Sequence, residues 1–142
     1  MKKTNTYGRK TYSELKSIDD YFDRFEYLKL HGDIGDRTFG SYRYVNQNFY
    51  TSRRWKSVRS EVIIRDGGCD LGIDTRPIIH RANVHHINPI TIDDILDENP
   101  CVFDLDNLIC VSSDTHKAIH YGDKSLLIED YVPRRPGDTT LW

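Results

Sequence analysis

Four of the six histidines in this chain fall into two pairs whose spacing could place them around one ion. His85 and His86 are adjacent, whereas His116 and His120 lie four residues apart. Neighbouring residues of a strand point to opposite faces, while residues four apart on a helix share one face. A doublet on a strand and a pair on a helix could therefore meet, with one member of the doublet joining the helix pair.

Such an arrangement has the parts that phosphodiester hydrolysis requires. Neutral imidazole is a good ligand for zinc, nickel and related divalent ions, and two or three protein ligands leave coordination positions open for the substrate. The histidine that faces away from the ion could take a proton from water, because imidazole titrates near neutral pH. The alternative for the doublet alone is a structural pair with one exposed member. The joint spacing of the two pairs favours the metal site.

The composition predicts one soluble, folded and rather polar globular domain. The chain has 142 residues, of which 37% are hydrophobic, 11% aromatic and 30% charged. No apolar run approaches the roughly 20 residues that cross a bilayer, and the opening MKKTNTYGRK has no apolar segment behind its lysines. We therefore expect no membrane partner and a cytoplasmic location. The three cysteines form no even disulfide framework, which favours reduced thiols.

The formal net charge is −2, but the charged residues are unevenly distributed. Residues 53–65 hold five bases and one acid, whereas residues 91–106 hold six acids and no base. Phosphate binding responds to such a local basic field, so contacts to a DNA backbone are predicted, with a solvated helix surface as the alternative. Arg81, four residues before His85, is a further predicted phosphate contact. The predicted DNA-binding residues are Arg53, Arg54, Lys56, Arg59, Arg65 and Arg81.

The first half of the chain is predicted to hold two helices. Residues 1–12 are expected to form a polar arm. An apolar stripe at helical spacing then predicts a helix between an N-cap at Ser17 and a terminating Gly32. Residues 33–50 are punctuated by glycine and rich in tyrosine, which predicts a loop or a short hairpin. A second helix, capped by Ser52, should carry the basic residues and bury Trp55, Val58 and Val62.

The second half is predicted to alternate short strands and short helices. Thr91 and Asp94 have the spacing of a helix cap, Ser112 or Ser113 could cap the helix that carries the later histidines, and Gly122 should end it. The tail from residue 131 is interrupted by proline and glycine and is expected to be an extended arm anchored by Trp142. The predicted strands are 69–73, 82–90 and 108–111, and the predicted helices are 91–99 and 114–122.

The order His85-His86, Asn107, His116, His120 resembles the HNH, or ββα-metal, endonuclease motif, with spacing similar to that of the colicin-type nucleases. The resemblance implies that His85 and His116 are metal ligands, and that His120 ligates the metal or contacts the phosphate. It implies that His86 is the general base and that Asn107 braces the loop and orients this base. Taken alone, Asn107 could simply be a turn residue. One divalent ion, Mg²⁺, Mn²⁺, Ni²⁺ or Zn²⁺, would be the cofactor.

The wider chain is similar to a family of HNH proteins encoded by double-stranded DNA bacteriophages. The match extends from about Thr11 to Trp142, in the stretches RDGGCDLGI, VHHINPIT, THKAIHYGD and GDTTLW. It implies an α+β fold, in which an HNH ββα-metal finger core has an N-terminal helical extension packed around it. The expected parts of this one globular domain are a polar arm (1–12), a helical region (13–66), the nuclease core (67–124) and an extended arm (125–142).

The cysteines depart from that family. Many phage HNH proteins carry two CxxC knuckles around a structural zinc ion, but the matching positions here are Cys69-x-x-Gly72 and Cys110-x-x-Ser113. No complete structural zinc site is therefore expected. Cys69 and Cys110 could still share an ion with His80 or an acid. The favoured interpretation is that apolar packing from the N-terminal helices takes the place of the zinc ion.

The sequence thus predicts a metal-dependent HNH DNA endonuclease that nicks or cuts phosphodiester bonds with weak sequence preference. A non-catalytic DNA-binding or packaging-accessory protein that retains the fold is the alternative, and an RNA-directed nuclease is a third possibility. The phage resemblance implies a setting beside terminase and portal proteins in genome packaging, or in mobile elements. The residues do not choose between these settings, and they do not name the metal.

Overall fold

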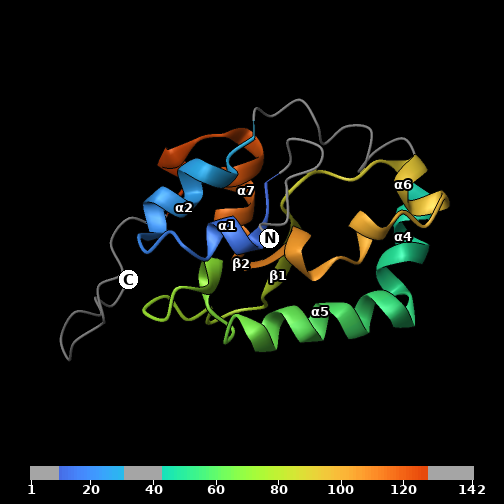
Figure 1. Ribbon diagram of the computed structural model, residues 1–142, viewed down its shortest axis with the longest axis horizontal. Coiled ribbons are helices and arrows are strands. Elements are labelled where there is room, and N and C mark those ends of the chain that lie inside the picture. The colour runs from blue at the N-terminus through green and yellow to red at the C-terminus, as the bar shows by residue number, and fades with distance from the viewer. Residues whose placement is uncertain (1–9, 31–42, 128–142) are drawn as a thin grey trace, which may run out of the picture.

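The computed structural model describes residues 10–30 and 43–127 of the chain. Within these ranges the protein is a mixed α+β structure, in which a two-stranded antiparallel sheet lies between two groups of helices (Figure 1). The helices are α1 (Tyr12–Leu15), α2 (Tyr21–Leu28), α4 (Arg43–Thr51), α5 (Arg53–Arg65), α6 (Ile92–Leu96) and α7 (Ser113–Tyr121). The strands are β1 (Asn83–His86) and β2 (Leu108–Val111), and the short 3-10 turns are η1 (Asp70–Gly72), η2 (Pro100–Val102), η3 (Leu105–Asn107) and η4 (Lys124–Leu126).

The register of the sheet decides which helices each histidine of the doublet meets. In the antiparallel ladder His85 is paired with Ile109 and His86 with Leu108. Because side chains alternate along a strand, His85 and Ile109 lie on one face of the sheet, and His86 and Leu108 lie on the other. The two histidines therefore face different groups of helices.

One hydrophobic core covers the face that carries His85. Phe25 and Leu28 of α2 pack there with Ala118 and Ile119 of α7 against Ile109 of β2, and all five are fully buried. In Figure 1, α2 and α7 lie together on this side of the strands.

A second core covers the face that carries His86. Phe49 of α4 and the α5 residues Trp55 and Val62 pack there with Leu108 and Cys110 of β2. The predicted burial of Trp55 and Val62 is confirmed, at 3% and 0% exposure, and Val58 is partly buried against the same cluster. In Figure 1, α5 runs along this side of the two strands.

Several predicted helix ends are confirmed by their caps. The Ser52 hydroxyl accepts a hydrogen bond from the Trp55 amide at the start of α5. Thr91 and Asp94 form a reciprocal capping box at the start of α6. Ser112 caps α7, which ends at Gly122 in the left-handed conformation at φ 66°.

The predicted first helix is wrong in its bounds. Its N-cap is Asp20, whose carboxylate accepts from the Asp23 amide, and the helix ends at Leu28. Ser17 instead donates its hydroxyl to the Glu14 carbonyl oxygen at the end of the separate helix α1. Gly32 lies outside the described residues. The last residues of the expected arm are also ordered differently, because α1 begins at Tyr12 with Thr11 as its N-cap.

Two further element predictions are wrong. Residues 43–50, expected in a loop or hairpin, belong to α4, in which Asn46 and Phe49 are buried one helical turn apart. Residues 69–73, expected as a strand, contain the turn η1 with Leu71 in the left-handed region at φ 54°, and only Cys69 keeps a β-bridge, to Pro77. The predicted C-terminal arm with Trp142 lies outside the described residues.

Carboxylates cover the edge of β2 that faces away from β1. Asp66 accepts a hydrogen bond from the Cys110 amide at 2.9 Å, and Asp70 accepts one from the Ser112 amide at 3.0 Å. The Arg65 guanidinium donates to the Leu108 carbonyl oxygen at 2.6 Å on the same edge. These bonds satisfy strand groups that would otherwise lack partners. They tie the segment after α5 to the strand that leads into α7.

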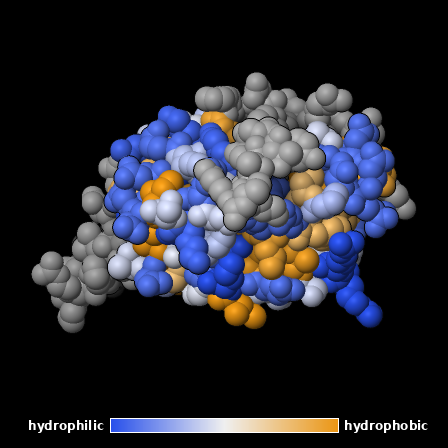
Figure 2. Space-filling view, in the orientation of Figure 1, coloured by the Kyte–Doolittle hydropathy of each residue, from blue (hydrophilic) through white to orange (hydrophobic). Residues whose placement is uncertain are grey.

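The surface is largely polar. On the face shown in Figure 2, hydrophilic side chains cover most of the described surface, and apolar side chains emerge between the sheet and α5. In residues 10–30 and 43–127 we find no helix with the length and apolar character needed to traverse a lipid bilayer.

Candidate metal centre

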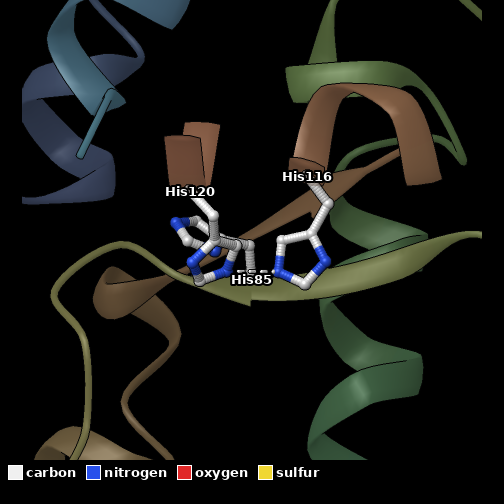
Figure 3. A group of neighbouring side chains, drawn as sticks. All are labelled: His85, His116 and His120. Carbon is white, nitrogen blue, oxygen red and sulfur yellow. Dashed lines mark hydrogen bonds between the residues drawn. The ribbon is translucent and has the colours of Figure 1, made fainter. Parts of the chain in front are cut away.

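Three histidines from β1 and α7 converge on one point (Figure 3). His85 extends from the strand, and His116 and His120 extend from one face of the helix. The ring centroid of His85 lies 5.1 Å from that of His116 and 5.1 Å from that of His120. One possible ligand nitrogen from each of the three rings lies within 4.8 Å of the other two. The group could bind a metal ion.

The three rings have the protonation state that binding an ion requires. Burial lowers the pKa of His85 well below its ordinary value, and the neighbouring His116 and His120 lower it further. Burial also lowers the pKa of His116, to about 4, and that of His120. All three rings are therefore neutral at pH 7, the form in which imidazole binds metals.

One of these atoms is a buried polar group that no described residue bonds. His85 is 2% exposed, and its Nε2 makes no hydrogen bond to any group in residues 10–30 and 43–127. Such an atom costs free energy unless something binds it. An ion between the three rings would satisfy His85 Nε2.

The separation of the helix nitrogens also fits a shared ion. His116 Nε2 and His120 Nε2 are 2.9 Å apart, so one of them donates a hydrogen bond to the other. Two nitrogens bound at about 2.1 Å to one ion would be separated by about 3.0 Å at right angles and by about 3.4 Å at the tetrahedral angle. An ion could therefore replace the shared proton with a small movement of these two rings. Three imidazoles without a carboxylate favour zinc, nickel or a related ion over magnesium, which prefers oxygen ligands.

Helix α7 is held in place by a buried polar network beside His116. The Thr115 hydroxyl donates to the Asp70 carboxylate at 2.5 Å, and the Tyr21 hydroxyl lies 2.7 Å from Thr115 Oγ1. The Ser112 hydroxyl donates to the same Asp70 carboxylate at 3.0 Å. The first turn of α7 is thus joined to η1 and α2, which fixes the helix that carries His116 and His120.

His86 lies on the opposite face of the sheet, away from the three-histidine group. Its ring stacks on Trp55 with 5.2 Å between centroids and 20° between planes. Its Nε2 is 3.0 Å from the Val102 carbonyl oxygen, and since a carbonyl can only accept, Nε2 carries the proton. Burial lowers the pKa of His86 to about 4, although the Val102 hydrogen bond opposes this effect. In the neutral ring Nδ1 therefore has a free lone pair, and no described residue bonds to it.

Asn107 joins the segments on both sides of His86. Its side-chain oxygen accepts hydrogen bonds from the Asn88 amide at 2.9 Å and from the Asn88 side chain at 2.7 Å. Its side-chain nitrogen donates to the Cys101 carbonyl oxygen at 3.0 Å. Cys101 precedes Val102, the residue whose carbonyl holds His86. The predicted bracing by Asn107 therefore has a physical route, through the backbone that orients the ring.

A single pocket of about 570 Å³ contains both kinds of histidine. Its lining includes the three-histidine group, His86, and residues of α4 and α5, but no residue of β2. The pocket therefore follows the outer edge of β1, where side chains from the two faces of the strand both reach it. It has cations in its walls, Lys56, Arg59 and Arg81, and no acid. Such a pocket favours an anion.

The predicted DNA-binding residues separate into two groups. Lys56, Arg59 and Arg81 line the pocket, and the Arg59 guanidinium is fixed by a hydrogen bond of 2.6 Å to the Ala82 carbonyl oxygen. Arg53 and Arg54 are exposed outside the lining, with Arg54 stacked 4.0 Å above the Phe103 ring.

Arg65 is used in a different way. Its guanidinium donates to the Leu105 and Leu108 carbonyl oxygens and to Asp66, and it stacks 3.5 Å above the Tyr12 ring. These contacts hold it against the outer edge of β2, and it does not line the pocket. Of the six predicted DNA contacts, it has the least freedom to meet a phosphate.

Sequence reasoning missed two contributions to the pocket. Tyr50, at the end of α4, lines it, and the Val102 carbonyl oxygen sets the tautomer of His86. A backbone carbonyl has no signature in sequence. Tyr50 had one signal, the helical spacing of the apolar residues Val45 and Phe49, which favours a helix in the residues before Ser52.

The cysteines are free thiols, two of them buried. Cys69 lies beside the Gly67 carbonyl oxygen, and burial raises the pKa of Cys110 to about 12. Among the described residues, the group of three possible metal ligands is the histidine group, and His80 is exposed elsewhere.

The chain matches no protein-family model, and comparisons with curated proteins and with solved structures found no match either.

Proposed function

We propose that this protein is a metal-dependent DNA endonuclease of the HNH, or ββα-metal, type. One observation carries the proposal: adjacent histidines of β1 serve two different environments that open into one pocket. His85 joins the possible metal ligands of α7, while His86 is held by a carbonyl with one ring nitrogen free. A binding site for a structural ion would need the first arrangement and not the second.

The three-histidine group would hold the ion. When bound, a divalent ion would neutralise charge on the scissile phosphate and on the departing 3′ oxygen. Three protein ligands leave coordination positions for substrate oxygens. The proposed ligands are His85, His116 and His120.

His86 would act as the general base. Its Nδ1 would take a proton from water, and the resulting hydroxide would attack phosphorus as the bond to the 3′ oxygen breaks. The pKa of about 4 is that of His86 in the protein without substrate. A phosphate anion in the pocket would raise the pKa towards neutrality, because a nearby negative charge favours the imidazolium. The Val102 carbonyl would stabilise the proton that Nε2 already carries.

The cations of the pocket would hold the DNA backbone. Arg59 offers a guanidinium already fixed in position, and Lys56 and Arg81 add charge around it. Contacts to phosphates give affinity and orientation but carry little sequence information. Weak sequence preference is therefore expected.

A plasmid-nicking assay with purified protein tests the proposal. Activity should appear with nickel, zinc or manganese, and should be weaker with magnesium because of the imidazole ligands. His86→Ala should abolish nicking while metal and DNA binding persist, and His116→Ala should abolish both nicking and metal binding.

Two results would contradict the proposal. A wild-type protein that binds DNA but cleaves nothing with any of the four ions would support a non-catalytic DNA-binding module instead. Cleavage of RNA in preference to plasmid, linear duplex and single-stranded DNA would reassign the substrate.

A further inference from the structure

Tyr50 places a phenol in the wall of the pocket that also contains the histidines. It is the penultimate residue of α4, next to Phe49, which is 7% exposed and belongs to the core. At this end of α4, Phe49 therefore packs in the core and Tyr50 lines the pocket. Packing alone would be served equally well by a second phenylalanine.

The ring of Tyr50 packs against two other aromatic rings. It meets Trp55 edge to face at 5.5 Å and 81°, and Phe49 at 4.8 Å and 71°. Trp55 is the residue on which His86 stacks. Trp55 therefore contacts both Tyr50 and His86, the proposed base, and the packed rings restrict the position of Tyr50.

The hydroxyl of Tyr50 is available as a donor. No residue in the ranges 10–30 and 43–127 makes a hydrogen bond with it, whereas the hydroxyls of Tyr21 and Tyr27 are both bonded within the protein. Burial raises the pKa of Tyr50, so the phenol keeps its proton at neutral pH. The pocket around it contains three cationic side chains and no carboxylate that could accept this proton.

These features suit an anionic oxygen as the acceptor of a hydrogen bond from Tyr50. The cations of the pocket favour an anion, and a neutral O–H donor adds a directed hydrogen bond to the charge of Lys56, Arg59 and Arg81. We propose that Tyr50 contacts the substrate, donating its hydroxyl hydrogen to a non-bridging oxygen of the scissile phosphodiester. The inference rests on the proposed nuclease function, to which it adds a substrate-binding residue.

The test is Tyr50→Phe, which keeps the ring against Phe49 and Trp55 and removes only the hydroxyl. Tyr121→Phe is the matched control, because Tyr121 is 64% exposed at the end of α7 and does not line the pocket. Cleavage would be measured on plasmid DNA and on bis(4-nitrophenyl) phosphate, a small phosphodiester. Metal affinity and the thermal midpoint would be measured on the same preparations.

The expected result is a loss of about 10- to 100-fold in kcat/KM for Tyr50→Phe on both substrates, the range for a hydrogen bond to a charged group. Metal affinity and thermal midpoint should equal those of the wild type, and Tyr121→Phe should cleave normally. The inference fails if Tyr50→Phe retains full activity, if its loss follows a drop in stability or metal affinity, or if only plasmid cleavage suffers. A wild type inactive with every ion would instead overturn the proposed function, and this inference with it.

Discussion

The buried histidines should make the metal-free protein sensitive to mild acid. His86 is 7% exposed, and its pKa is lowered to about 4, from 6.5. In the unfolded chain its ring takes a proton as the pH falls below about 6.5, while in the folded protein it does not until about 4. The unfolded state therefore binds more protons in this window, and the free energy of unfolding falls as the pH falls.

The size of the effect follows from the displacement of the pKa. A difference of about 2.5 pH units corresponds to about 3 kcal/mol for His86, of which about 2 kcal/mol should be lost by pH 5. His116, whose pKa is also lowered to about 4, changes in the same direction. A typical domain has a free energy of unfolding of about 5 to 15 kcal/mol, so the loss expected from these histidines is a large part of it.

Urea unfolding in EDTA at pH 7.5, 6.5, 5.5 and 5.0 measures this loss, with His86→Gln as the comparison. Glutamine keeps a donor for the Val102 carbonyl but does not titrate. Subtracting the two pH profiles removes the contribution of the carboxylates, which both proteins share. The wild type should lose about 2 kcal/mol more than the variant between pH 7.5 and 5.0. Parallel profiles would refute the buried, neutral state of His86.

Other predictions concern the helix end, the brace and the cation. Gly122→Ala should destabilise by at least about 2 kcal/mol in urea unfolding, because its new Cβ would lie 2.2 Å from the Leu30 carbonyl oxygen at positive φ. Gly68 also has a positive φ, but a Cβ at this position would have no atom within 4 Å. Gly68→Ala should therefore lower the free energy of unfolding by only about 1 kcal/mol. Equal losses in the two variants would contradict a clash with the Leu30 carbonyl oxygen. Asn107→Ala should lower plasmid nicking by about 10- to 100-fold at unchanged metal affinity, measured by calorimetry. Arg59→Ala should raise KM for DNA and lower the slope of log affinity against log salt by about 1; an unchanged slope would remove it from the DNA contacts.

Local signals in the sequence predicted the elements that local physics controls. Ser52, Thr91 and Gly122 mark helix ends because a side-chain cap or a left-handed residue acts within a few residues of its own position. Strand alternation likewise predicts that His85 and His86 lie on opposite faces of the sheet, as they do. These rules need no knowledge of distant segments.

Elements that depend on distant contacts were missed. The stretch that forms α4 has only scattered apolar residues, and its buried side chains meet partners from α5 and α6. Asp20 took the cap position predicted for Ser17, since both residue types suit an N-cap and the choice depends on how α1 packs.

The pocket could be predicted in part. Spacing brought His85, His116 and His120 together, because helix periodicity fixes two of them and the strand supplies the third. The position of Arg65 against the edge of β2 could not be predicted from the sequence, since the carbonyl groups that it bonds belong to residues some 40 positions away. Basic residues on a helix form a face that can bind phosphate only where their side chains do not donate hydrogen bonds to distant parts of the protein, as Arg65 does.

The proposed roles of His85 as a metal ligand and His86 as the base are tested most directly by measuring metal binding to single variants. Isothermal titration of zinc or nickel into the wild type, His85→Ala and His86→Ala would compare the two neighbours under identical conditions. His86→Ala should bind one ion per chain with an affinity within a few-fold of the wild type, while His85→Ala should lose at least about 100-fold. Equal losses in the two variants, or a greater loss in His86→Ala, would contradict the separation of ligand and base on which the proposed nuclease depends.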